Sequence, residues 1–438
     1  MTTYNLISFG GIFVLMGLAW LCSTERRRVN WRVVIWGTAL QLLFALFIFR
    51  VPVGTKLFLL VNDLVVKVLD CATAGTKFLF GRLALPPGTA DASGETSLGF
   101  FLAFQALPTI VFFAALMGAL YYLGIMPWLV RAFASVFTRL MRLSGAESLC
   151  AASNIFVGIE SALTIRPHLE NMTRSELCTI LTAGMATIAS SVMALYVFVL
   201  QGQFPTIAGH LVSASIISAP AAVVMAKLMV PETGQPLTLG MAIRPSYERE
   251  HNLIEAIING ANSGVRLVVG IAALLLAFLG LVALVDLLLG ALGHWLTRLV
   301  GLRLDLSLRA ILSLVFYPLT LVIGVPPSDA WAVARLIGER TVATEVQSYQ
   351  DLAAMLAVGS LQEPRSAVIA AYALCGFAHI ASLAIFVGGI AALAPRRTAE
   401  LSSLGFRALW AATLACLMTG AVAGTFLGKT TILAGALR

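Results

Sequence analysis

Two short stretches of the chain nearly repeat each other: Ala183-Gly-Met-Ala-Thr-Ile-Ala-Ser190 and Cys375-Gly-Phe-Ala-His-Ile-Ala-Ser382. Both lie within apolar segments and contain several small residues. Thr187 and His379 occupy the same position of the repeat. In membrane proteins built from two similar halves, such a pair of glycine-interrupted apolar segments indicates a solute site near the bilayer midplane. The repeat therefore predicts a binding site between two discontinuous helices.

The composition places these segments in a membrane. Of the 438 residues, 59% are hydrophobic and only 11% are charged, whereas soluble domains carry about 25% charged residues. The apolar run over residues 267–289 is long enough to cross a hydrocarbon core of about 30 Å as a helix. The alternation typical of membrane-barrel strands is missing from the sequence. We therefore predict an all-α polytopic membrane protein.

Charge, cysteines and motifs exclude several functions. The net charge of +8 comes from basic residues in short loops between spans, where they set orientation rather than bind nucleic acid. The six cysteines show no CxxC or Cys/His spacing, so neither a metal site nor a disulfide framework is predicted. The chain has no Gly-x-Ser-x-Gly, Walker A or His-Glu-x-x-His motif. We expect no enzyme activity, no ATP-driven transport and no organic cofactor.

Hydropathy predicts eight spans and two further membrane segments. The spans cover residues 6–22, 33–51, 100–125, 177–200, 207–230, 265–289, 354–393 and 408–427. Residues 148–165 are too short and too polar for a span, so they predict a re-entrant hairpin. A second hairpin is expected over 309–345, with its break at Gly324-Val-Pro-Pro327 and Glu345 at its end. Residues 128–143 predict an amphipathic helix in the interface plane.

The basic loops define the expected topology. They cover residues 26–32, 131–142, 166–174, 244–249 and 396–397, and all five are cytoplasmic if both termini are outside. Each half then contains a hairpin, a broken span and a span, and the two broken spans cross in opposite directions. This inverted repeat favours a secondary transporter over a channel or a membrane-embedded enzyme.

We expect five regions along the chain. Residues 1–99 form N-terminal spans and a loop, 100–145 a scaffold span with the interfacial helix, and 146–230 the first repeat. Residues 231–305 form a cytoplasmic loop and a scaffold span, and 306–438 form the second repeat.

Uncharged oxygens in the first half suggest a cation site. Asn154 and Thr187 come from two different discontinuous elements. Backbone carbonyls freed by unwinding, at Val157 and Ile188, could complete an oxygen cage for Na⁺. The alternative is that Asn154 and Thr187 only bond across packed helices.

Carboxylates and aromatic residues suggest a solute site. Glu160 and Glu345 lie at membrane depth, one in each expected hairpin, where a charge is costly and usually faces a cavity; the alternative places either at a hairpin end near water. His379 shares a helix face with Ser382. His379 could donate to a solute hydroxyl, carry a proton or simply pack, and Phe377 could stack on a solute or belong to the core.

Several blocks of sequence resemble the concentrative nucleoside transporter family. The blocks are Ala146-Glu-Ser148 through Asn154-Ile-Phe-Val-Gly158, Ile165-Arg-Pro-His-Leu169, Met172-Thr-Arg-Ser-Glu-Leu177, Gly184 to Ser190, Asn252-Leu-Ile-Glu-Ala256, Asn259-Gly-Ala-Asn262, Tyr372-Ala-Leu-Cys-Gly-Phe-Ala378, Gly388-Gly389 and Ala394-Pro-Arg-Arg397. They stand in the family's order and cover most of the chain. The resemblance implies a homotrimer with a scaffold domain. It also implies a transport domain of two hairpins and two unwound helices that moves across the membrane like an elevator.

The resemblance also assigns roles to residues. It implies that Asn154, Val157, Thr187 and Ile188 hold sodium. It further implies that Glu345 and Ser382 contact the ribose, and that Phe377 and Val192 lie near the solute and its base.

Two segments differ from the family pattern. The first hairpin tip, which contacts the base and typically reads Gly-Gln-Thr/Ser-Glu, is Gly158-Ile-Glu-Ser161 here. His379 replaces a ribose-contacting asparagine, and Thr344-Glu345 replaces the usual Asn-Glu pair.

These observations predict a sodium-coupled nucleoside symporter of a bacterial inner membrane. Glu345, His379 and Ser382 are expected on the ribose, with Glu160, Ser161, Val192 and Phe377 around the base. The altered tip leaves open a proton-coupled carrier of a modified nucleoside or another polyhydroxylated solute. A passive channel or a solute sensor is a third possibility.

Overall fold

The computed structural model describes residues 2–86, 89–90, 94–246, 250–300 and 306–428, excluding the side chains of 296–300. Within these residues the fold is helical, and β-structure is limited to isolated bridges such as Ala90 with Thr96. The predicted all-α fold is confirmed. Glu248 and Arg249, in one of the loops used to predict topology, lie outside the described residues.

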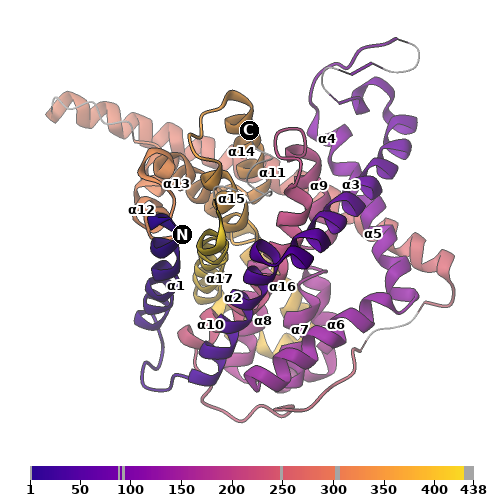
Figure 1. Cartoon of the computed structure of the whole chain (residues 1–438), viewed down its shortest axis with the longest axis vertical. Coiled ribbons are helices and arrows are strands. Elements are labelled where there is room, and N and C mark those ends of the chain that lie inside the picture. Colours follow the sequence, from indigo (N-terminus) through magenta and orange to yellow (C-terminus); the bar gives the residue numbers. More distant parts are fainter. Residues whose placement is uncertain (1, 87–88, 91–93, 247–249, 301–305, 429–438) are drawn as a thin grey trace.

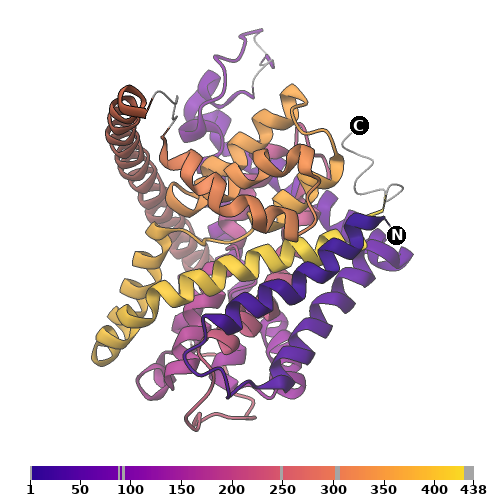
Figure 2. The same cartoon turned by 90° about the vertical axis from the view of Figure 1, so that its left-hand side faces the viewer.

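The N-terminal third supplies helices that surround the core. They are α1 (Thr3–Leu21), α2 (Trp31–Arg50), α3 (Pro52–Phe80), the single turn α4 (Leu102–Gln105), α5 (Leu107–Tyr122) and α6 (Ile125–Val136). Figure 2 shows α1, in indigo, running alongside α17, in yellow. The helix α3 was not predicted as an element. It begins directly after Val51 because Pro52 fits the first helical position.

The first half contains the expected hairpin and broken helix. Its elements are α7 (Gly145–Ser153), the 3₁₀ helix η3 (Ile159–Asn171), α8 (Arg174–Ala186), α9 (Ser190–Leu200) and α10 (Ile207–Met229). The chain reverses between α7 and η3, and it unwinds between α8 and α9. The Ser190 N–H donates to the Phe156 carbonyl at 2.8 Å, so the hairpin tip contacts the helix break.

The second half has the same order of elements, with a correction to the hairpin. It contains α12 (Leu308–Val322), α13 (Pro327–Val342), α14 (Glu345–Val358), α15 (Pro364–Ala373), α16 (Ile380–Leu393) and α17 (Thr398–Phe426). The predicted break at Gly324 is present, with a φ of +89°, and it joins α12 to α13, which pack against each other. The hairpin that carries Glu345 at its tip is the next one along the chain. The hairpin consists of α13 and α14 and turns at Ala343 and Thr344, so Glu345 lies at its tip.

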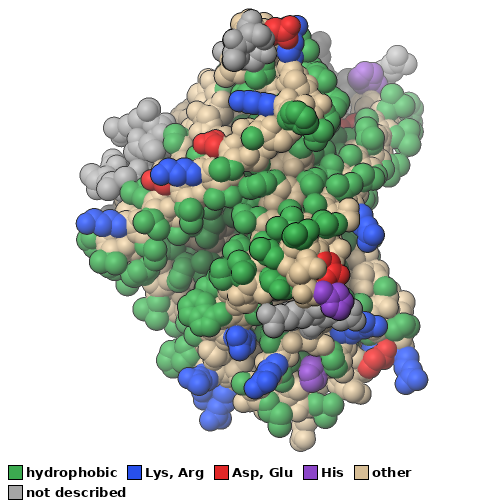
Figure 3. Space-filling model, turned by 90° about the vertical axis from the view of Figure 1, so that its right-hand side faces the viewer, with side chains coloured by type: hydrophobic (Ala, Val, Ile, Leu, Met, Phe, Trp, Pro, Cys, Tyr) green, Lys and Arg blue, Asp and Glu red, His purple; other side chains and the backbone are tan. Residues whose placement is uncertain are grey.

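The broken span predicted over 354–393 is interrupted as expected, but it begins later than predicted. The predicted range comprises the end of α14 and the broken helix α15–α16, and Gly359 ends α14 with a φ of +67°. Among the described residues, seven helices are long and apolar enough to cross a membrane, and they match the other seven predicted spans. On the face in Figure 3, hydrophobic side chains cover the middle, and Lys and Arg gather towards the lower end.

The helix α11 (Leu253–Val300) packs mainly against α5, and the two form the α5–α11 wall. In Figure 1, α11 runs behind the other helices. Glycines allow the two helices to approach closely. A Cβ at Gly118 would lie 2.4 Å from the Ala256 carbonyl oxygen, and one at Gly260 would lie 2.5 Å from that of Ala114.

The two nearly repeated stretches contact each other at their breaks. Gly376 has a φ of +140°, and a Cβ there would lie 2.7 Å from the Ala186 carbonyl oxygen. Side chains from α10 and α17 satisfy the freed carbonyls: Ser218 Oγ donates to Ala186 O at 2.7 Å, and Cys416 Sγ donates to Cys375 O at 3.1 Å. Neighbouring helices thus make the unwound backbone tolerable at membrane depth.

Candidate functional site

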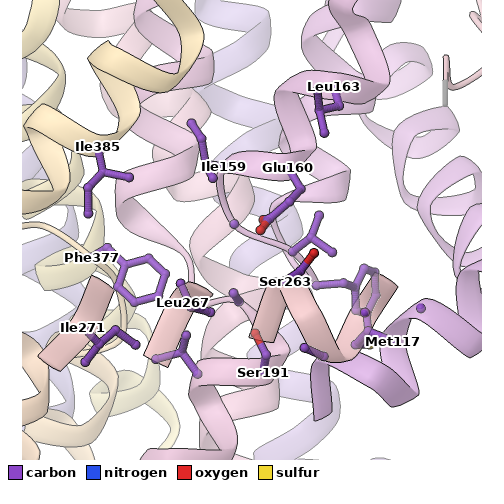
Figure 4. Close-up of a pocket in the computed structure, with 18 of the residues that line it drawn as sticks. Met117, Ile159, Glu160, Leu163, Ser191, Ser263, Leu267, Ile271, Phe377 and Ile385 are labelled. Carbon is purple, nitrogen blue, oxygen red and sulfur yellow. The ribbon is translucent and has the colours of Figure 1, made fainter. Parts of the chain in front are cut away.

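A cavity of about 420 Å³ lies between the hairpin tips, the broken helices and the α5–α11 wall. Figure 4 shows how residues from these elements face a common space, with Phe377 from one helix break, Glu160 from the first hairpin and Ser263, Leu267 and Ile271 from α11. The volume suits a small organic solute, since ligand pockets span roughly 300–1,000 Å³. The predicted solute site therefore coincides with an open volume.

Glu345 is the best-anchored polar group of the cavity. Its side chain is buried, and Tyr196 Oη donates to Oε1 at 2.6 Å. His379 Nε2 lies 2.9 Å from Oε2. The carboxylate is therefore held from α9 and from the start of α16 at the same time.

The tautomer of His379 follows from its second nitrogen. The Ser382 backbone N–H donates to His379 Nδ1 at 3.2 Å, where His379 caps the N-terminus of α16. In a neutral imidazole one nitrogen accepts and the other donates, so we assign the proton to Nε2, which donates to Glu345. Both His379 nitrogens are thereby used within the protein.

Ser382 and Phe377 both line the cavity from the second break. Ser382 Oγ donates to the carbonyls of Phe377 and His379, the latter at 2.7 Å. Its oxygen also accepts from the His379 backbone N–H at 3.4 Å, which leaves one lone pair able to accept from a solute. The ring of Phe377 is half-buried and projects into the cavity (Figure 4).

The first hairpin contributes Glu160 to the lining, and α9 contributes Val192. Ser161 does not line the cavity. It is buried, with its Oγ 3.6 Å from Cys150 Sγ. The segment from Ile159 is a 3₁₀ helix, in which each residue turns by about 120°, so adjacent side chains point in different directions.

The candidate cation ligands lie where the first hairpin tip meets the first break. Asn154 ends α7, and its Nδ2 donates to Cys150 O at 3.1 Å, while its buried Oδ1 has no hydrogen-bond partner. Thr187 ends α8 and donates to Ala183 O at 2.8 Å, which leaves its oxygen lone pairs. Val157 lies at the tip and Ile188 in the break.

This donor set suits an alkali cation. The unpaired Asn154 oxygen is costly when buried and would be satisfied by a cation. The described residues contain no cluster of three His, Cys, Asp or Glu side chains that could hold a metal ion. Hard, uncharged oxygens of this kind are ligands that Na⁺ accepts in unwound helices.

Sequence reasoning missed Tyr196 and the wall of α5 and α11. Tyr196 follows Val192 by four residues, so helical spacing could have placed it on the same face. No sequence signal indicated that Met117, Ser263 and Leu267 would line the cavity, because their contribution depends on how α5 and α11 pack against the two halves.

Charge sets a limit on the solute. The described residues that line the cavity include the carboxylates of Glu160, Glu250 and Glu345 but no Lys or Arg. A phosphate group would meet negative charge without a compensating cation. The cavity therefore favours uncharged or cationic solutes over nucleotides.

Models of one protein family match most of the chain. The N-terminal part of the Na⁺-dependent nucleoside transporters matches residues 10–83, and the C-terminal part matches residues 210–424. A nucleoside recognition (Gate) model matches residues 103–203.

Relatives from animals and a bacterium support the match. Solute carrier family 28 member 3 of Mus musculus is 39% identical over 434 residues, which are 96% of this chain and 58% of that protein. The chain thus spans somewhat more than half of the mammalian relative's length. An uncharacterized transporter of Haemophilus influenzae is 38% identical, with 97% of this chain and 98% of that protein covered.

Solved structures agree with the fold. The transporter CNTnw in an inward-facing substrate-bound state has a TM-score of 0.85 and 34% identity, covering 97% of this chain and 98% of that chain. A CNTnw variant in an outward-facing state has a TM-score of 0.86 with the same coverage. The relatives are transporters and not enzymes, as predicted. The chain belongs to the Na⁺-dependent nucleoside transporter family.

Proposed function

We propose that the protein is a symporter that imports nucleosides on a sodium gradient. The observation that carries the proposal is the anchored carboxylate of Glu345. Tyr196 Oη donates to Oε1 of Glu345, and His379 Nε2 lies 2.9 Å from Oε2. An ionised carboxylate has about four acceptor positions. One position on each oxygen remains for two hydroxyl donors of one sugar, with Ser382 beside them.

The coupling ion is proposed to bind at Asn154, Val157, Thr187 and Ile188. The unpaired Asn154 Oδ1 supports this assignment, as does the contact between the hairpin tip and the helix break. An ion at this junction would hold the tip against the break and so shape the wall of the solute cavity. Sodium would then favour the binding-competent form of the site.

An elevator motion is proposed to carry the site across the membrane. The cavity lies between the two halves on one side and the α5–α11 wall on the other. Movement of the halves along this wall would transfer the cavity from one side to the other. The exposed apolar side chains of α11 support the homotrimer that we expect in a bacterial inner membrane, because they need lipid or a partner subunit.

Transport by the purified protein in sealed vesicles tests the proposal. We expect labelled uridine to accumulate above its external concentration when a sodium gradient is applied, and uridine monophosphate not to compete. Accumulation driven equally by a pH gradient without sodium would replace sodium by a proton as the coupling ion. Equilibration without accumulation would indicate a passive channel, and binding without any uptake would indicate a solute sensor.

A further inference from the structure

The carboxylate of Glu160 stands in the cavity without a partner. Across the described part of the chain, Glu160 forms no side-chain hydrogen bond and no ion pair, unlike Glu345, whose Oε1 accepts from Tyr196 and whose Oε2 lies 2.9 Å from His379 Nε2. Figure 4 shows the Glu160 carboxylate directed towards the space that Phe377 and Ser263 also face. Glu160 is thus available to a solute.

The local backbone explains this position. Glu160 is in the first turn of η3, where a negative charge interacts favourably with the start of the helix. Its Oε2 lies close to Gly158, since a Cβ added to this glycine would be 3.5 Å from that oxygen. The carboxylate therefore lies against the hairpin tip, on the side of the first helix break, where Ala189 is also close to Gly158.

An ionised carboxylate can only accept hydrogen bonds, and its two oxygens suit two parallel N–H donors. Guanine offers this pair on one edge, at N1–H and the 2-amino group. Hypoxanthine offers one ring N–H, which lies between a carbonyl and a C–H group. Uracil offers one ring N–H between two carbonyls. Adenine and cytosine offer one amino group beside an unprotonated ring nitrogen, whose lone pair would face the second carboxylate oxygen.

We infer that the cavity prefers guanosine, the nucleoside whose base presents two neighbouring N–H donors to Glu160. This inference rests on the proposed function and specifies its substrate. The ring of Phe377 can stack on any base, so it adds affinity without choosing among bases. The hydroxyls of Ser191 and Ser263 can donate or accept and so do not oppose the preference.

Competition for uridine uptake in vesicles tests the inference. Guanosine and inosine differ only in the 2-amino group. We expect guanosine to inhibit at a concentration at least about 10-fold lower than inosine, since a hydrogen bond to a charged group contributes roughly that factor or more. 1-Methylguanosine, which lacks the N1–H, should lose most of this advantage.

Variants assign the preference to the carboxylate. In Glu160→Gln one acceptor becomes a donor, so the guanosine-to-inosine ratio should fall to about 3-fold or less. Glu160→Asp retains two acceptor oxygens and should keep a preference for guanosine. Glu170→Gln is the matched control, because Glu170 lies at the other end of η3 and is not among the residues that line the cavity; it should leave the ratio unchanged.

Three results would overturn the inference: equal inhibition by guanosine and inosine in the natural protein, an unchanged ratio in Glu160→Gln, or loss of the preference in a Glu160→Asp protein that still transports uridine. If Glu160→Gln transports nothing, the Asp variant decides alone. If no nucleoside is transported by the natural protein, the proposed function itself fails, which is a separate result.

Discussion

Glu345 and His379 join the tip of the second hairpin to the second helix break, with Glu345 Oε2 2.9 Å from His379 Nε2. His379 Nδ1 accepts from the Ser382 N–H. The histidine therefore caps α16 with one ring nitrogen and orients the Glu345 carboxylate with the other. The geometry therefore gives His379 a positioning role.

Replacement of Glu345 should remove sugar recognition. In Glu345→Gln one oxygen becomes an NH₂ group, which cannot accept from Tyr196 or His379. Each lost hydrogen bond to a charged group costs about 1.5–3 kcal/mol, so KM for uridine should rise at least about 10-fold, and Glu345→Ala should abolish uptake. Uridine uptake in vesicles measures both effects. Near-normal KM in either variant would remove Glu345 from the site.

The two roles of His379 can be separated by isosteric variants. The amide of glutamine reaches the position of Nε2, whereas that of asparagine reaches the position of Nδ1. His379→Gln keeps a donor for Glu345, so uridine uptake should fall by less than about 10-fold. Loss of a complete hydrogen bond to a charged group would lower uptake by more than that. His379→Ala loses both contacts, so its uridine uptake should be well below that of His379→Gln. Equal uptake by the Ala and Gln variants would show that the contact to Glu345 is unimportant.

His379→Asn provides the complementary test. Asparagine is a good N-cap but is too short to reach the Glu345 oxygen. If the cap alone matters, the Asn variant should match the natural protein. If the contact with Glu345 matters, the KM of the Asn variant for uridine should rise. A direct bond from the new amide to the sugar would offset this rise. In that case a 3′-deoxy analogue would lose more affinity in the Asn variant than in the natural protein.

The sequence predicted the helix breaks because local composition encodes them. Gly184, Thr187, Gly376 and His379 interrupt apolar segments, and such interruptions need a cavity or protein contacts. The sequence also predicted the turn at Gly324-Val-Pro-Pro327, which joins α12 to α13. It missed the second turn at Ala343 and Thr344, because neither residue is a glycine or a proline.

The remaining features of the cavity depend on tertiary structure. The direction of Ser161 follows from the 3₁₀ form of η3, which a sequence period does not reveal. The wall of the cavity comes from α11, more than 50 residues beyond the first break in the chain, and it is set by close packing against α5 at Gly118 and Gly260. The ligand roles assigned to Asn154, Val157, Thr187 and Ile188 remain predictions.

Loss of the unpaired oxygen at Asn154 should abolish coupling. Asn154→Ala removes the Oδ1 that would bind the ion, so sodium should no longer stimulate uridine uptake, and the sodium concentration for half-maximal uptake should rise beyond measurement. Thr413→Ala is the control. Thr413 is also buried, but its hydroxyl donates to Leu409 O within its own helix. Unchanged sodium stimulation in Asn154→Ala would place the ion elsewhere.

A buried ion pair should anchor the first hairpin to α10. Lys227 Nζ lies 2.7 Å from Glu147 and 3.0 Å from Ser175 Oγ. Lys227→Met leaves the Glu147 carboxylate uncompensated, and removal of one partner of a buried pair costs about 3–5 kcal/mol. Thermal unfolding in detergent should show a large loss of stability, and addition of Glu147→Gln should recover part of it. Strictly additive losses in the double variant would contradict the coupling.

The paired glycines of the repeated stretches should respond differently to alanine, although they occupy equivalent positions. A Cβ at Gly184 would lie 2.2 Å from the ring of Phe386, whereas one at Gly376 would lie 2.7 Å from the Ala186 carbonyl oxygen, on a backbone with φ of +140°. A side chain can be shortened but a backbone oxygen cannot. Gly184→Ala should therefore cost about 1–3 kcal/mol in the natural background and much less in Phe386→Ala, as measured by thermal unfolding. Gly376→Ala should stay strongly destabilising in both backgrounds, because its strain arises from the backbone at the contact between the two breaks. Equal relief of both substitutions by Phe386→Ala would mean that the breaks do not pack in this way.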